Sequence, residues 1–230
     1  NNAIKGLVKA PRPFQVDDSI IVMREHTATG YSFPSGHTQA GTVFYASIAK
    51  TLKSKKLWIV LSVVIFLIGL SRVYLGVHFP KDVVAAIALG LMVACICAFL
   101  YQKVQHNLRL KMIFYGSIAV LFLPFVFIFY HSEYEQMVIY RDFYTGYGLY
   151  LGFVLAIFIE NKYVNFDCSS LLKTRLIRFA IGLIIIVIIQ FGLKFAFPSE
   201  SIFFDMLRYF LISLVGLGLY PLSFKSLKLL

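Results

Sequence analysis

The chain has 230 residues, of which 59% are hydrophobic and only 14% are charged. This composition, with its apolar residues in long blocks, excludes a soluble globular domain and indicates an all-α, polytopic transmembrane helix bundle. The net charge of +11 does not indicate a nucleic-acid partner, because no basic, solvent-exposed domain is long enough to hold one.

Predicted elements follow in chain order. The first 37 residues are too polar to span a membrane, and their prolines and glycines predict a loop with short helical pieces. Seven apolar blocks come next, at 38–53, 57–76, 82–102, 111–131, 143–160, 176–197 and 203–222. The first block is short for a membrane span.

The connectors between these blocks alternate in charge. Those on one side carry Lys53, Lys55, Lys56, Lys103, Arg109, Lys111, Lys162, Lys173, Arg175, Arg178, Lys225 and Lys228, with only Glu160 and Asp167 acidic. Lys and Arg in short loops stay on the cytoplasmic side, so this pattern places the 31–37 segment outside the cytoplasm.

Some basic residues on the predicted outer side break this rule. They are concentrated before the first block and around the turn between the second and third blocks: Lys5, Lys9, Arg12, Arg24, Arg72 and Lys81. An anionic ligand bound on the outer side explains this exception.

Small and sulfur-containing residues in the blocks have structural interpretations. Cys95 and Cys97 share one apolar block and Cys168 lies in a polar connector, so we predict buried or free thiols rather than a metal site or a disulfide. Gly148 and Gly152 form a small-xxx-small pair that predicts close helix packing rather than a ligand site.

Two segments have the residues for phosphate chemistry. Pro34, Ser35, Gly36 and His37 come directly before a long helix, whose unpaired amides and Ser35 hydroxyl make an anion cradle beside His37. The second segment runs from Ser71 to Asp82.

In that second segment, Arg72 offers a guanidinium fork to phosphate oxygens, and Pro80 suits the first turn of a new helix. His78 and Asp82 are four residues apart, so in a helical turn the carboxylate can hold the imidazole N–H and leave the other nitrogen as a nucleophile or base. For Arg72 the alternative is snorkelling to the interface, but the spacing favours phosphate binding.

With Lys5 and Arg12-Pro13, these segments resemble the type 2 phosphatidic acid phosphatase superfamily, which includes soluble bacterial acid phosphatases and vanadium haloperoxidases. That pattern is Lys-x6-Arg-Pro, Pro-Ser-Gly-His and Ser-Arg-x5-His-x3-Asp, and all three parts occur here in order with their intervals intact. The resemblance covers residues 5 to about 100. We therefore expect a phosphatase motif region at 1–100 and further transmembrane helices of the same membrane domain at 101–230.

The resemblance implies a role for each matching residue. His78 attacks phosphorus and forms a phosphohistidine, Asp82 orients and polarises His78, and His37 protonates the leaving oxygen and then helps to activate water. The phosphate-binding residues are Lys5, Arg12, Ser35, Gly36 and Arg72. It implies no metal and no other cofactor.

The implied activity is hydrolysis of a lipid phosphate or diphosphate, and the charge pattern places it at the outer face of a cell membrane, most simply a bacterial inner membrane. Candidate substrates are undecaprenyl diphosphate, phosphatidylglycerophosphate, phosphatidic acid and a lipid A phosphate. One alternative is transfer of phosphate to another lipid, because a phosphohistidine does not choose water by itself. The other is a non-enzymatic lipid-binding or transport protein, against which the intact His37, His78 and Asp82 argue.

Two further expectations concern the ends of the chain. Helices usually precede the Lys-x6-Arg-Pro segment in membrane members, whereas only four residues precede Lys5 here, so we expect further residues before it in the natural protein. Near the other end, Arg208 is expected to pair with an acidic neighbour such as Asp205, and a weaker hypothesis gives it a second head-group charge.

Overall fold

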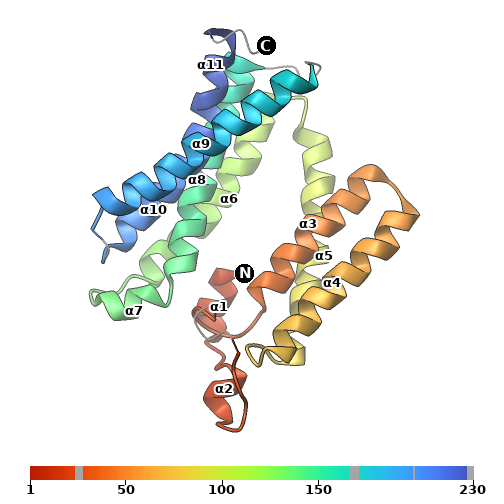
Figure 1. Ribbon diagram of the computed structural model, residues 1–230, viewed down its shortest axis with the longest axis vertical. Coiled ribbons are helices and arrows are strands. Elements are labelled where there is room, and N and C mark those ends of the chain that lie inside the picture. Colours follow the sequence, from red (N-terminus) through yellow and green to blue (C-terminus); the bar gives the residue numbers. More distant parts are fainter. Residues whose placement is uncertain (24–27, 166–170, 199, 227–230) are drawn as a thin grey trace. The chain divides into compact units, whose positions relative to one another are not determined.

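The computed structural model describes residues 1–23, 28–165, 171–198 and 200–226, and in these residues it contains helices and no strand (Figure 1). The predicted all-α fold is therefore confirmed. The chain divides into two compact units, Asn1–Lys103 and Val104–Leu230. That both belong to one membrane domain stays a prediction. Four residues used in the charge and thiol arguments lie outside the described part of the chain: Arg24, Asp167, Cys168 and Lys228.

Within its described residues, the first unit contains two short helices followed by three long ones. These are α1 (Asn2–Val8), α2 (Pro13–Val16), α3 (Gly36–Leu52), α4 (Lys55–Tyr74) and α5 (Pro80–Val104). A short turn reverses the chain between α3 and α4: Lys53 adopts a left-handed conformation, and the Ser54 side chain accepts a hydrogen bond from the Leu57 amide, which caps α4. The two helices are therefore antiparallel, and the start of α3 and the end of α4 lie at the same end of the unit.

Glycines let α5 approach the other two long helices closely. A Cβ at Gly69 of α4 would lie 2.5 Å from Val83 of α5, and one at Gly90 of α5 would lie 2.7 Å from Thr42 of α3. Such contacts are typical of membrane helices that associate by backbone proximity. They hold the first turn of α5 beside the end of α4.

The described residues of the second unit form four long helical segments and a few short ones. In chain order these are α6 (Leu108–Ile128), α7 (Tyr134–Val138), α8 (Arg141–Ile159), the π-helical η2 (Glu160–Val164), α9 (Leu172–Ala196), α10 (Ile202–Leu214), the π-helical η3 (Val215–Leu219) and α11 (Tyr220–Ser226).

Close packing of α8 against α10 is the main contact in this unit. A Cβ at Gly148 would lie 2.3 Å from the Met206 carbonyl oxygen, and one at Gly152 would lie 2.2 Å from that of Phe210. The structural interpretation of this glycine pair is confirmed. On another face of α8, Tyr144, Tyr147 and Tyr150 donate hydrogen bonds to α6 backbone carbonyls at 2.8–3.0 Å.

Six helices of the described residues are long and apolar enough to cross a membrane, by length and composition: Lys55–Tyr74, Pro80–Val104, Leu108–Ile128, Arg141–Val164, Leu172–Ala196 and Ile202–Phe224. They correspond to six of the seven predicted blocks. The remaining block is α3, which has 17 residues, in keeping with the prediction that it is short for a span. Cys95 and Cys97 are free, as predicted.

An ionic cluster centred on the buried Asp205 joins α8 and α10. Arg208 donates to Asp205 Oδ1 at 2.6 Å, and Arg141 Nε lies 2.7 Å from Asp205 Oδ2. The expected pairing of Arg208 with an acidic neighbour is thus present, and its partner is Asp205. A buried carboxylate needs such partners because an uncompensated buried charge is strongly destabilising.

Candidate active site

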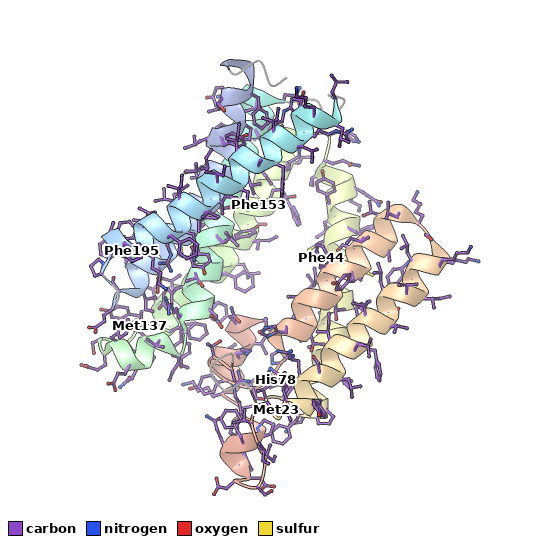
Figure 2. The ribbon with its side chains drawn as sticks, in the orientation of Figure 1. Met23, Phe44, His78, Met137, Phe153 and Phe195 are labelled. Carbon is purple, nitrogen blue, oxygen red and sulfur yellow. The ribbon has the colours of Figure 1, made fainter. Side chains whose placement is uncertain are left out.

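The predicted site residues gather at one end of the first unit, where α3 begins, α4 ends and α5 begins. Figure 2 shows His78 at this end, in the connector between α4 and α5. The Ser35 amide donates to the Asp82 carbonyl at 3.2 Å, and the Val77 amide donates to the Arg72 carbonyl at 3.3 Å. Backbone contacts therefore bring the Ser35 segment and the His78 segment together.

His78 is buried, and its Nδ1 atom faces two polar neighbours. Asp82 Oδ2 lies 3.5 Å from Nδ1, and the Ser32 hydroxyl lies 3.3 Å from it. The Ser32 hydroxyl also donates to Asp82 Oδ2 at 2.5 Å. The expected His78–Asp82 pair thus exists, but 3.5 Å is long for a hydrogen bond, and a serine hydroxyl contacts both partners.

Asp82 also organises the start of α5. The helix begins at Pro80, as predicted, and Asp82 Oδ2 accepts a hydrogen bond from the Phe79 amide at 2.9 Å. A carboxylate in the first turn satisfies an amide there and interacts favourably with the helix dipole. Asp82 is therefore held by the backbone independently of His78.

The turn before His78 depends on Gly76. This residue has φ +70°, a conformation that L side chains rarely adopt, and an added Cβ would lie 3.1 Å from the Ile21 carbonyl oxygen. The tight turn and the packing of the N-terminal loop against it direct the chain from α4 to His78.

Arg12 is almost fully buried and ties the N-terminal loop to this turn. Its guanidinium donates to the carbonyls of Thr29 at 2.7 Å, Gly30 at 3.0 Å and Val77 at 2.8 Å. The Val77 contact joins Arg12 to the residue directly before His78. Arg12 thus places a positive charge next to His78 while several of its N–H groups bind the backbone.

The predicted anion cradle surrounds the start of α3. Ser35 immediately precedes the helix, is fully buried, and has its hydroxyl 3.0 Å from that of Thr38. Its side chain makes no capping bond to the backbone, so the first amides of α3 can face a ligand. Gly36 opens the helix, and His37 in the same turn is exposed.

The site therefore has a buried part and a more accessible rim. Arg12, Ser35, His78 and Asp82 are buried, whereas Lys5 and Arg72 are half-buried. Burial lowers the pKa of His78; the neighbouring Asp82 carboxylate opposes this shift, while the charges of Arg12 and Lys5 lower the pKa further. At neutral pH His78 is a neutral imidazole, as a nucleophile or base requires.

Sequence reasoning missed Ser32. It is fully buried, and its amide donates to the Ala10 carbonyl at 2.9 Å. No sequence interval relates it to His78, which lies 46 residues further along the chain. A serine two residues before Pro34 would pass as a loop residue, so only the structure reveals its contact with the imidazole.

Comparisons with known proteins cover both units. Residues 1–106 match the family model of the PAP2 superfamily. Residues 144–230 match that of the PAP2 superfamily phosphatase transmembrane extension. No solved structure matches the chain.

Curated relatives match over part of their length. Phosphatidylglycerophosphatase B of Bacillus subtilis is 37% identical over 46% of this chain and 53% of its own length. An undecaprenyl-diphosphatase of Sulfolobus acidocaldarius is 40% identical over 34% of this chain and 37% of its own. The lipid A 1-phosphatase of Rhizobium etli is 31% identical over 44% of each. The chain spans about half the length, or less, of these relatives.

Proposed function

The chain belongs to the PAP2 superfamily, and on that premise we propose that this multi-pass membrane protein is a phosphatase that releases phosphate from a lipid phosphate or diphosphate. The observation that carries the proposal is the convergence of three sequence segments at His78. Ser35 binds the backbone of Asp82, and Arg12 binds the carbonyl next to His78.

We assign the nucleophile to His78. Nε2 attacks phosphorus, the bond from phosphorus to the leaving oxygen breaks, and His37 donates a proton to that oxygen. Water then attacks the phosphohistidine, His37 takes up a proton from the water, and the N–P bond breaks to release inorganic phosphate. A covalent intermediate replaces one difficult displacement by two easier ones.

Positive groups and amides in the site stabilise the transferred phosphoryl group. Lys5 and Arg72 lie at the rim, and the Ser35 hydroxyl and the Gly36 amide lie at the start of α3. Arg12 contributes mainly its charge, because its guanidinium also donates to four backbone carbonyls. Such preorganised charges and donors act on the oxygens over which the transition-state charge spreads.

An apolar groove in the first unit supports a lipid substrate. It has a volume of about 870 Å³ and follows one face of α3, with Gly36, Ala40, Val43, Ser47 and Leu52 in its lining. The groove begins at Gly36, next to Ser35 of the anion cradle, and α3 is about 25 Å long. An acyl or prenyl chain can lie along this groove while its phosphate reaches His78.

We place the reaction at the outer face of the membrane, in a bacterial inner membrane. The basic turn at Lys53, Lys55 and Lys56 joins the C-terminus of α3 to the N-terminus of α4. It therefore lies at the opposite end of these two helices from the site. Lys and Arg in short connectors stay cytoplasmic, so His78 then faces the extracytoplasmic side. The substrate stays in the membrane plane, which suits a diphosphate or monophosphate head group at the lipid surface.

Phosphate release from a panel of lipid phosphates tests this function. The purified protein in detergent is expected to release inorganic phosphate from phosphatidic acid, phosphatidylglycerophosphate or undecaprenyl diphosphate with EDTA present, and vanadate is expected to inhibit it. An absolute Mg²⁺ requirement would contradict the histidine mechanism. Release of phosphate only when a second lipid acceptor is present would favour a phosphotransferase, and binding without turnover would favour a non-enzymatic protein.

The pH profile tests the state of His78. Only neutral His78 attacks, and its pKa is lowered from 6.5, so kcat/KM should fall with decreasing pH through a midpoint below 6.5. Replacing Lys5 by methionine removes a positive charge that lowers this pKa, and should move the midpoint upward by about a few tenths of a unit. The matched control is Lys9→Met, an exposed lysine outside the motif. An acid limb above 6.5 in the wild type would contradict the assignment.

A further inference from the structure

Ser32 makes a contact that the proposed roles of the motif residues do not use. It lies in the loop before α3, is fully buried, and is held by the hydrogen bond from its amide to the Ala10 carbonyl at 2.9 Å. Its hydroxyl reaches both Asp82 Oδ2 and His78 Nδ1. A loop serine thus lies against the two side chains on which the proposed nucleophile depends.

The proton on this hydroxyl determines the state of the imidazole. An ionised carboxylate only accepts hydrogen bonds, so Ser32 must donate its single proton to Asp82. Towards His78 the hydroxyl oxygen can then only accept, which requires a proton on Nδ1. The lone pair of the neutral ring is consequently on Nε2, and Nε2 has no hydrogen-bond partner among the described residues.

We propose that Ser32 is a positioning residue for His78: its hydroxyl links the imidazole to Asp82, selects the tautomer with the proton on Nδ1, and directs Nε2 to the phosphorus. This inference rests on the proposed function. Asp82 alone orients the ring less well, because its carboxylate is 3.5 Å from Nδ1, whereas Ser32 is closer to both groups. Outer partners of functional histidines commonly act in this way.

Removal of the hydroxyl should affect turnover more than binding. The half-buried Lys5 and Arg72 are not among the hydrogen-bond partners of Ser32. In Ser32→Ala we expect kcat to fall by about 10- to 100-fold, with KM changed less than about two-fold. Ser32→Thr retains a hydroxyl and should restore part of the lost turnover.

The acid limb of the pH profile should move as well. The charged groups that act on His78 are Asp82, Arg12 and Lys5. Without the Ser32 proton on its oxygen, the Asp82 carboxylate stabilises the imidazolium more strongly, so the pKa of His78 rises and the limb moves to higher pH. If Ser32 had only a packing role, the midpoint of the acid limb would be the same in Ser32→Ala as in the wild type.

The matched control is Ser19→Ala. Ser19 also donates its hydroxyl to an aspartate, Asp17, at 2.6 Å, but both are exposed and outside the site. Its removal should leave kcat and the pH profile unchanged. A Ser32→Ala protein with wild-type kcat and an unmoved acid limb would overturn the proposal.

A measurement independent of turnover separates this inference from the proposed function. Nitrogen-15 NMR of the imidazoles, with the His78 signal identified by its loss in His78→Ala, should report a proton on Nδ1 in the wild type and mixed tautomers in Ser32→Ala. If no phosphate is released but the tautomer change is observed, the phosphatase function is rejected and the role of Ser32 in setting the tautomer of His78 is retained. The same tautomer in both proteins would reject the role of Ser32 even if the phosphatase is active.

Discussion

Replacing His78 by alanine is expected to abolish phosphate release, lowering kcat by at least about a thousand-fold. The substitution removes the only group that we assign to the attack on phosphorus, whereas the charges of Lys5, Arg12 and Arg72 stay. Substrate binding should therefore persist while turnover is lost. Initial rates on the best lipid of the panel, with binding measured separately, will show this split.

The control for this substitution is His106→Ala. His106 is exposed, lies in the turn after the C-terminal end of α5, and belongs to no motif, so the activity of the His106→Ala protein should equal that of the wild type. Rapid denaturation in alkali should trap labelled phosphoenzyme from the wild type and none from His78→Ala, because phosphohistidine is stable to alkali. Phosphoenzyme in the His78→Ala protein, or full turnover by it, would assign the nucleophile elsewhere.

Substitution of Gly152 by alanine should destabilise the second unit. The new methyl group would lie 2.2 Å from the Phe210 carbonyl oxygen, and that backbone cannot move aside as a flexible side chain does. Overpacking of this kind costs about 1–3 kcal/mol, and at about 2–4 °C per kcal/mol for a chain of this size it lowers the unfolding midpoint by about 2–12 °C. Thermal unfolding in detergent measures the change.

Gly146 provides a matched control in the same helix. A Cβ added there would have nothing within 4 Å, so Gly146→Ala gains only the better helix propensity of alanine, up to about 1 kcal/mol. We expect its midpoint to equal or exceed that of the wild type. Equal midpoints for the two variants would show that α8 and α10 pack less closely than the structure indicates.

Several features could be predicted because they depend on local sequence. The apolar blocks match the observed helices to within a few residues, and Pro80 begins α5. The four-residue spacing of His78 and Asp82 places them on one face of a turn, and the structure has them in contact. Close packing at Gly148 and Gly152 followed from the absence of side chains in a helix interior.

Other features could not be predicted from local sequence. Block 203–222 is not one uniform α-helix: α10 ends at Leu214 and a π-helical segment follows, and no periodicity in the sequence signals the change. Arg12 stood in a motif that implies phosphate binding, yet its guanidinium also holds the carbonyls of Thr29, Gly30 and Val77. The partners of a buried side chain depend on which distant segments fold around it.

The sequence by itself determined the membrane helices, the motif intervals and the charge asymmetry, because these depend on residues near one another in the chain. Only the tertiary structure decided what surrounds His78. Ser32 is 46 residues away from it, and the carbonyl that Arg12 binds at Val77 is 65 residues from Arg12. Contacts over such separations form when helix packing brings loop backbones together, so no spacing rule in the sequence encodes them.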